Sequence, residues 1–278
     1  MAHRVRSALK QLPGAGRAQD FAPMHHSDLL AKHEVFAPNS AGRPAERSSL
    51  ALASAGNTFP FIADYLSEFV SVPEIITAED FARSHGGDSW DVLAAAFAEQ
   101  RSDKSTSHDY HLVYGPLLAE LGEVKALLEV GLGTNNEDVV SHMTATGTPG
   151  ASLRAFREYL PSAEIFGADI DRRVLFSEER ITTFFVDQTD PAAVDALSDQ
   201  LPDLDLVIDD GLHSPDANIS IVRLARRCLR AGGYLVIEDI APAAAPLWCV
   251  MSKLFADDFD ACYVRARGGD MWIGRRRD

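Results

Sequence analysis

Cysteine, basic residues and long apolar runs are all scarce in this chain of 278 residues. Its three cysteines, Cys228, Cys249 and Cys262, are too widely spaced for a CxxC pair or a disulfide framework, so we expect a reducing cytoplasm. Lysine and arginine number 26 against 41 acidic residues, and the net charge of -15 repels phosphate backbones and anionic lipid. The longest weakly polar run, 240–251, is too short to span a bilayer. We therefore expect neither nucleic acid nor a membrane as a partner.

The remaining composition is that of an ordinary globular protein, with 46% hydrophobic and 24% charged residues. Residues 1–57 are rich in Ala, Gly, Pro and Ser, and we expect a loose or partly disordered arm there. Residues 58–122 read as a helical auxiliary or lid segment, and residues 123–278 as the main domain. The apolar flank is hard to cover within one small sheet domain, so we expect a homo-oligomer that uses it.

The flank carries helical signals and no convincing strand before residue 126. Thr77 begins a capping-box-like sequence, Thr-Ala-Glu-Asp, and a third helix is expected over about 108–121. The polar stretch 103–111 fits two interpretations, a part of a ligand pocket or a solvated helix start.

After residue 124, short apolar strands alternate with helices, which is typical of a parallel sheet covered on both faces. The sequence predicts strands over 126–130, 164–168, 182–186, 205–208 and 233–237. Helices are expected over 151–159 and from Pro215 to the glycine pair at 232–233. Residues 259–264 and 270–274 form a closing hairpin. The predicted fold class is α/β, with a doubly wound, mostly parallel Rossmann-like sheet, a C-terminal antiparallel hairpin and a helical N-terminal flank.

The first predicted strand ends in a glycine loop, Gly131-Leu-Gly133, at the position where such sheets bind ligands. Two features argue against a dinucleotide. The sixth position of a GxGxxG pattern is Asn136, and the acidic residue after the second strand, Asp169, lies far beyond the expected spacing of about 20 residues. S-adenosylmethionine carries no phosphate and needs only a backbone loop, a carboxylate for the ribose and an acceptor for the adenine amine.

Such groups follow the first three strands in order, and this order resembles the class I S-adenosylmethionine-dependent methyltransferases over about residues 123–278. The resemblance makes residues 123–278 the S-adenosylmethionine-binding catalytic domain. Asp171 is the rival of Asp169 for the ribose. The expected cofactor-binding residues are Glu129, Gly131, Gly133, Asn135, Asp169, Asp187, Gln188 and Asp209.

Carboxylates follow the fourth and fifth strands, as Asp209-Asp210 and Glu238-Asp239. Side chains at neighbouring strand ends repel one another unless a cation, a proton or a basic group compensates. Hard oxygen ligands with room for substrate suit Mg²⁺. His213 lies one residue before the expected helix cap, where a neutral imidazole beside a metal-held hydroxyl is a suitable general base.

Four segments resemble the macrocin/mycinamicin type of sugar O-methyltransferase, metal-dependent enzymes that modify deoxysugars on macrolide antibiotics. These segments are 150–161, 166–170, 208–213 and 237–240. Matched residue by residue, the resemblance implies that Asp210, Glu238 and Asp239 ligate Mg²⁺ and that His213 is the base. The long loop 134–149 and the Ala/Pro-rich stretch 241–246 depart from the pattern, so the acceptor pocket is left open.

The sequence thus favours an S-adenosylmethionine- and Mg²⁺-dependent O-methyltransferase of antibiotic biosynthesis, acting on a small-molecule hydroxyl, a sugar of a secondary metabolite. One alternative is a metal-independent N-methyltransferase of a natural-product amine, whose turnover is unaffected by chelation. The other is a non-catalytic cofactor-binding module, which binds S-adenosylhomocysteine and transfers no methyl group.

Overall fold

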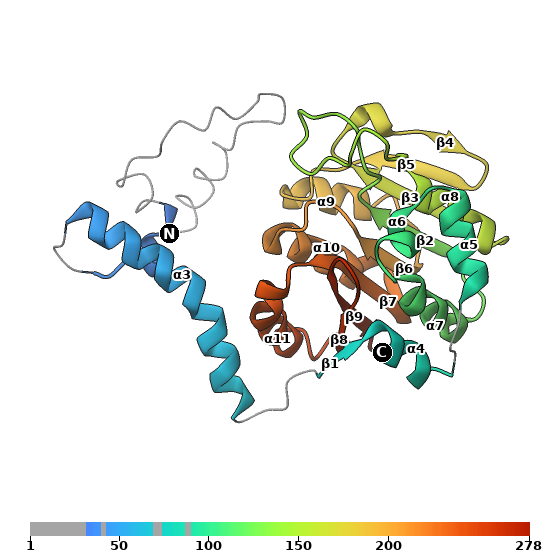
Figure 1. Ribbon diagram of the computed structural model, residues 1–278. Helices are drawn as coiled ribbons and strands as arrows, with labels where there is room; N and C mark the ends of the chain where they lie inside the picture. The colour runs from blue at the N-terminus through green and yellow to red at the C-terminus, as the bar shows by residue number, and fades with distance from the viewer. Residues whose placement is uncertain (1–31, 40–42, 69–73, 87–89) are drawn as a thin grey trace.

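The computed structural model describes residues 32–39, 43–68, 74–86 and 90–278, and within them one mixed sheet of nine strands runs through the molecule (Figure 1). Across the sheet the strands are β1 (Ile75–Thr77), β8 (Phe259–Arg265), β9 (Asp270–Arg276), β7 (Leu229–Ile240), β6 (Leu204–Asp209), β2 (Ala126–Val130), β3 (Glu164–Asp169), β5 (Ile181–Phe185) and β4 (Ser177–Glu178).

The strand order reverses between β2 and β6. From β2 the chain proceeds outward through β3 and β5, and it then returns to place β6 and β7 on the other side of β2, all of them parallel. In a doubly wound sheet, ligands bind beyond the carboxyl ends of the strands at this reversal. β9 pairs antiparallel with β7 and with β8, which confirms the predicted hairpin, and β1 lies beyond β8 at the edge of the sheet.

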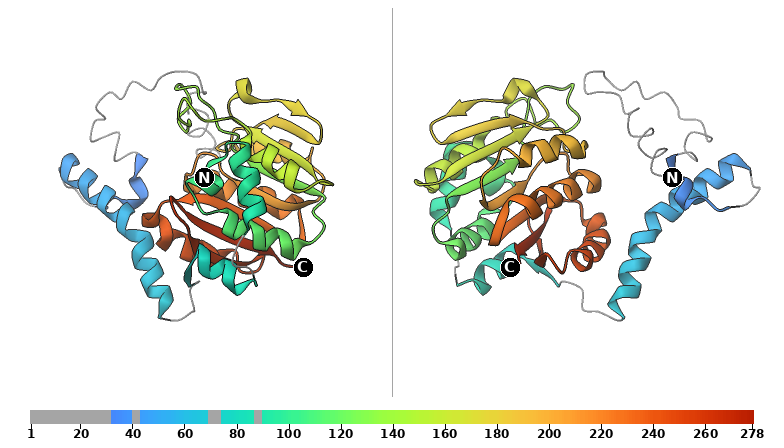
Figure 2. Two further views of the ribbon diagram at one scale, coloured as in Figure 1. Left: turned by 45° about the vertical axis from the view of Figure 1, so that its right-hand side comes forward. Right: turned by 180° about the vertical axis from the view of Figure 1, so that it is seen from behind.

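Helices cover both faces of the sheet (Figure 2). One face carries α4 (Ala78–Ser84), α5 (Asp91–Glu99), α6 (Asp103–Thr106), α7 (His111–Leu121) and α8 (Ala151–Tyr159). The other carries α9 (Pro191–Ser198), α10 (Pro215–Cys228) and α11 (Ala245–Leu254), and α3 (Pro44–Ser67) packs against α11. Short 3-10 turns are η1 (Glu34–Phe36), η2 (Arg172–Val174) and η3 (Pro242–Ala244).

Alternation along the strands assigns each side chain to one of two apolar cores. Leu127 of β2 belongs to the core under α4–α8, whereas its neighbour Leu128 belongs to the core under α9–α11. In β6, Ile208 and Val207 divide in the same way. Because the side-chain period of a strand is two, this alternation also decides which polar residues near the strand ends share a face.

Three expectations for the elements need correction. β1 pairs in parallel with β8, so the flank contributes a strand before residue 126. The helix expected from about 108 begins at His111. α10 ends at Cys228 and β7 begins at Leu229, so Gly233 lies within the strand and does not end the helix. A Cβ at Gly233 would come 2.8 Å from the carbonyl oxygen of Asp205 on β6, and the close approach of the two strands accounts for the glycine. The expected Thr77 cap is confirmed, since its hydroxyl accepts the amide N–H of Asp80.

The expected boundary at residue 57 falls inside α3, so residues 44–57 are helical rather than loose. Phe59 packs against the core beside α11, and this contact explains why the helix continues through the boundary. The expectation for residues 1–31 lies outside the described residues. Leu50 and Phe61 of α3 are exposed, and a homo-oligomer through the flank stays a prediction. Among the described helices, none combines the length and the apolar character that a bilayer crossing requires.

Candidate active site at the carboxyl ends of β2, β6 and β7

The glycine loop after β2 is tied to the ends of both neighbouring strands. The amide of Gly131 donates to the carbonyl of Ala168 at 2.8 Å, and the amide of Asp210 donates to the carbonyl of Val130 at 2.7 Å. Gly131 has a φ of 102°, and a Cβ there would lie 1.9 Å from the carbonyl oxygen of Asp210. Only glycine permits this close approach of the two chain segments.

Asp169 holds the glycine loop from the end of β3. Its carboxylate accepts the amide N–H groups of Leu132 at 2.8 Å and of Asp171 at 2.7 Å, and burial raises its pKa. Asp171 is also buried. Hydrogen bonds from Arg173, Thr134 and other neighbouring donors hold the pKa of the Asp171 carboxyl well below its usual range. Both candidates for the ribose contact, Asp169 and Asp171, therefore hold the glycine loop in place through hydrogen bonds.

The long loop 134–149 folds back over the glycine loop. The side-chain amide of Asn135 donates to the carbonyls of Thr144 at 2.7 Å and Gly147 at 3.1 Å. Met143 packs on Gly133, where a Cβ would lie 2.0 Å from the methionine Cε. Asn135 thus orders the loop that covers this part of the site.

Asp209 lies beneath the site rather than in it. It is fully buried, and its oxygens accept hydrogen bonds from Gln188 at 2.7 Å and from Asn218 of α10 at 2.9 Å. Gln188 in turn accepts the amide N–H of Leu212 at 2.9 Å, so both ends of its side chain are bound. Asp187 is partly exposed and accepts hydrogen bonds from Thr189. Alternation explains the placement, because Asp209 points to the α10 face and Asp210 to the opposite face.

Three carboxylates on the α4–α8 face surround one buried lysine. The ammonium Nζ of Lys104 lies 2.8 Å from Asp210 Oδ2 and 3.2 Å from Glu129 Oε1, and it also contacts Glu238 Oε2. Burial opposes the charge of Lys104, but Asp210, Glu238 and Glu129 outweigh it and raise its pKa well above the usual value. Burial likewise raises the pKa of Glu129 and of Glu238, and Lys104 counters both shifts.

Two tyrosines of the flank complete the hydrogen bonding of the carboxylates near the end of β7. The hydroxyl of Tyr114 donates to Glu238 Oε1, and that of Tyr110 donates to Asp239 Oδ1. His108 Nδ1 lies 3.5 Å from the same oxygen of Asp239. Both oxygens of Glu238 are therefore engaged by flank residues, whereas Oδ2 of Asp239 points away from them.

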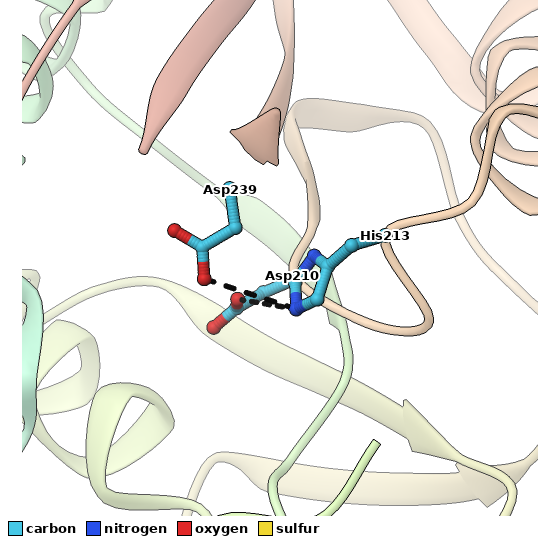
Figure 3. A group of neighbouring side chains, drawn as sticks. All are labelled: Asp210, His213 and Asp239. Carbon is cyan, nitrogen blue, oxygen red and sulfur yellow. Dashed lines mark ion pairs between the residues drawn. The ribbon is translucent and has the colours of Figure 1, made fainter. Parts of the chain in front are cut away.

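Asp210 and His213, which follow β6, face Asp239 near the end of the paired strand β7 (Figure 3). His213 Nε2 lies 4.0 Å from Asp210 Oδ1 and 3.8 Å from Asp239 Oδ2, and the ligand atoms of the three residues lie within 4.8 Å of one another. His213 and Asp239 have positive φ values of 55° and 54°. Such conformations are costly for non-glycine residues and cluster at functional sites.

This donor set fits a divalent cation. Two carboxylate oxygens converge beside one imidazole nitrogen, and the site is open enough that all three side chains are between about a quarter and a third exposed. The carboxylate oxygens suit a hard cation, and the imidazole nitrogen beside them can stay free to accept a proton. Of the expected metal ligands, the structure gathers Asp210 and Asp239 with His213 and places Glu238 next to them, against Lys104.

Sequence reasoning missed Lys104 and Tyr114. The polar stretch 103–111 fits a ligand pocket or a solvated helix start, and the structure places Lys104 of this stretch against Glu129, Asp210 and Glu238. Two features of the sequence point to these residues. Lys104 directly follows the cap sequence Ser102-Asp103, and Tyr110 and Tyr114 lie one helical turn apart, so that both can face the same neighbours.

The strand order, the glycine loop after β2 and the acidic residues after β3 and β6 define the Rossmann-like fold of class I S-adenosylmethionine-dependent methyltransferases. Solved structures of MycE, a methyltransferase from the mycinamycin biosynthetic pathway, share this fold. The complex of MycE with Mg and SAH has a TM-score of 0.53 and 22% identity, over 66% of this chain and 54% of that chain. The complex that also holds Mycinamycin VI has a TM-score of 0.54 and 21% identity, with the same coverage.

The curated relatives are sugar O-methyltransferases of antibiotic pathways. The 8-demethyl-8-alpha-L-rhamnosyl tetracenomycin-C 2'-O-methyltransferase of Streptomyces olivaceus is 28% identical over 167 residues, which are 60% of this chain and 41% of that protein. Demethylmacrocin O-methyltransferase of Streptomyces fradiae is 35% identical over 97 residues, 35% of this chain and 25% of that protein. Mycinamicin VI 2''-O-methyltransferase of Micromonospora griseorubida is 36% identical over 98 residues, 35% of this chain and 24% of that protein.

The matched part of this chain spans about two fifths or less of the length of these relatives. No family model matches the chain. The comparisons therefore establish the fold and the sequence similarity to these enzymes.

The buried position of Asp209 leads to a stability prediction. Asp209→Asn places an amide against a side-chain amide donor, and we expect a loss of about 1–3 kcal/mol in the free energy of unfolding, typical of a buried group left unsatisfied. Asp187→Asn changes a partly exposed carboxylate and should stay within about 0.5 kcal/mol of the wild type. Urea unfolding measures both. Equal stabilities for the wild type and Asp209→Asn would contradict the supporting role of Asp209.

Proposed function

We propose that the protein is an S-adenosylmethionine- and Mg²⁺-dependent O-methyltransferase that acts on a sugar hydroxyl of a small natural product. The observation that carries the proposal is the convergence of the glycine loop with Asp210, His213 and Asp239 at the strand-order reversal. The name of the Streptomyces olivaceus relative supports a sugar hydroxyl as the acceptor, since that protein is a 2'-O-methyltransferase of a rhamnosyl tetracenomycin.

The cofactor would lie along the glycine loop of Gly131 and Gly133, with its ribose beside Asp169 or Asp171. Asn135 orders the loop above it, and Glu129 and Asp187 complete the proposed cofactor environment. Gln188 and Asp209 would support this environment from beneath, through their hydrogen bond and the one from Leu212 N–H to Gln188. When bound, S-adenosylmethionine supplies an electrophilic sulfonium methyl group. The backbone of the loop, which lies against Asp210 after β6, would hold the cofactor in a fixed orientation, and orientation of this kind is a large part of transfer catalysis.

Asp210 and Asp239 would hold the divalent cation, together with Glu238 once its oxygens are released. A bound Mg²⁺ makes a hydroxyl that contacts it more acidic and fixes its orientation. His213 Nε2 faces the same space as the two aspartates, so it is placed to accept the hydroxyl proton. The strained backbone at His213 and Asp239 aims both side chains into that space.

The test of the proposal is methyl transfer from labelled S-adenosylmethionine to rhamnosyl glycosides, with and without EDTA. We expect EDTA to abolish transfer and Mg²⁺ to restore it.

His213→Ala should keep S-adenosylhomocysteine and Mg²⁺ binding but lower turnover by about 10²–10⁴-fold, the usual effect of losing a general base. Asp210→Ala should instead lose Mg²⁺ affinity and recover part of its activity at excess Mg²⁺.

Transfer to the glycoside hydroxyl at full rate in EDTA would remove the metal role. Transfer to an amine and not to the glycoside, at a rate that EDTA leaves unchanged, would favour the metal-independent N-methyltransferase. S-adenosylhomocysteine binding with no transfer to any glycoside or amine would favour the non-catalytic module.

A second prediction concerns the cofactor alone. Asp169→Ala removes the acceptor of two loop amides and the proposed ribose contact, and hydrogen bonds to charged groups contribute about 1.5–3 kcal/mol. We expect S-adenosylhomocysteine to bind at least about tenfold more weakly in isothermal titration calorimetry. Glu178→Ala, which changes a carboxylate on β4 that pairs with Arg154 and Arg157, is the control and should leave the affinity unchanged. An unchanged affinity in Asp169→Ala would remove this carboxylate from the site.

A further inference from the structure

The backbone of the flank directs the side chain of Lys104 into the acidic cluster, which consists of Glu129, Asp210, Glu238 and Asp239. The hydroxyl of Ser102 caps α6 by accepting the amide N–H of Lys104, and the carbonyl of Lys104 accepts the amide N–H of Tyr110 at 2.9 Å. Ser105 anchors the same turn to the carbonyl of Ala94 on α5 at 3.0 Å. The side chain of Lys104 is only 2% exposed, so the backbone on both sides fixes where its ammonium lies.

The ammonium of Lys104 contacts oxygens of the same carboxylates that would bind the cation in the proposed metal site. Oδ2 of Asp210 lies 2.8 Å from Nζ of Lys104, while Oδ1 of the same residue faces His213. Glu238 offers no second oxygen, because Tyr114 donates to Oε1 and Lys104 donates to Oε2. A cation that binds to Glu238 must therefore share an oxygen with Lys104 or with Tyr114, or replace one of these contacts.

We propose that Lys104 is an internal counter-cation of the acidic site, which competes with a divalent cation for the oxygens of Asp210 and Glu238 and thereby weakens the binding of that cation. The inference rests on the proposed function for the presence of the divalent cation. Lys104 acts here as a positioning residue. It holds the carboxylates of three adjacent strands, β2, β6 and β7, in one arrangement and sets the affinity of the site for metal.

The charge balance gives the direction of the effect. Glu129, Asp210, Glu238 and Asp239 bring four carboxylates together, and Lys104 is the buried ammonium among them. A unit positive charge about 5 Å from a divalent ion opposes its binding by at least roughly tenfold, even with the dielectric constant of water. Removal of this charge also releases one oxygen of Asp210 and one of Glu238.

The test compares Mg²⁺ binding to the full chain by isothermal titration calorimetry in the wild type and in Lys104→Met, which keeps the side-chain length and removes the charge. We expect Lys104→Met to bind Mg²⁺ at least about tenfold more tightly. Its melting temperature should fall below that of the wild type in EDTA, because the carboxylates then repel one another, and Mg²⁺ should restore most of the difference. Lys125→Met removes an exposed lysine before the amino end of β2 and should leave the Mg²⁺ affinity within about twofold.

Unchanged or weaker Mg²⁺ binding in Lys104→Met, with binding intact in the wild type, overturns this inference alone. Failure of both proteins to bind Mg²⁺ overturns this inference and the metal role in the proposed function together. If Lys104→Met does not fold, the comparison is repeated between Glu129→Gln and the double variant Lys104→Met/Glu129→Gln, which restores the charge balance. The double variant should then bind Mg²⁺ more tightly than Glu129→Gln, and an equal or lower affinity overturns the inference.

Discussion

The site depends on the pairing of one buried ammonium with carboxylates from three adjacent strands. Lys104 contacts Glu129 after the middle of β2, Asp210 directly after β6 and Glu238 near the end of β7. Buried carboxylates this close are costly unless they are compensated. The pairing therefore links the helical flank to the sheet, and it makes the flank a part of the site rather than a separate cover.

The arrangement of the strands determines which carboxylates can take part. Because β2, β6 and β7 are parallel neighbours at the strand-order reversal, their carboxyl ends lie together. Alternation then separates Asp209, which anchors Gln188 and Asn218 on the α10 face, from Asp210, which faces Lys104 and His213. Two consecutive aspartates thus have different structural surroundings, one beneath the site and one within it.

The sequence predicted the features that local patterns encode. The parallel strands, the start of α10 at Pro215 and the glycine loop all follow from short-range signals, and so does the position of His213. It did not predict the partner of Asp210, because Lys104 is 106 residues away in the chain and no local pattern links the two. The strand β1 was missed for the same reason, since its three residues gain their partner only from β8.

The most direct test of the site is a crystal structure of the protein grown with saturating Mg²⁺ and S-adenosylhomocysteine. We expect a cation in contact with Asp210 and Asp239, within reach of His213, and the cofactor along the loop from Gly131 to Gly133. A cation bound elsewhere, or a cofactor that avoids this loop, would contradict the assignment of this cluster as the active site.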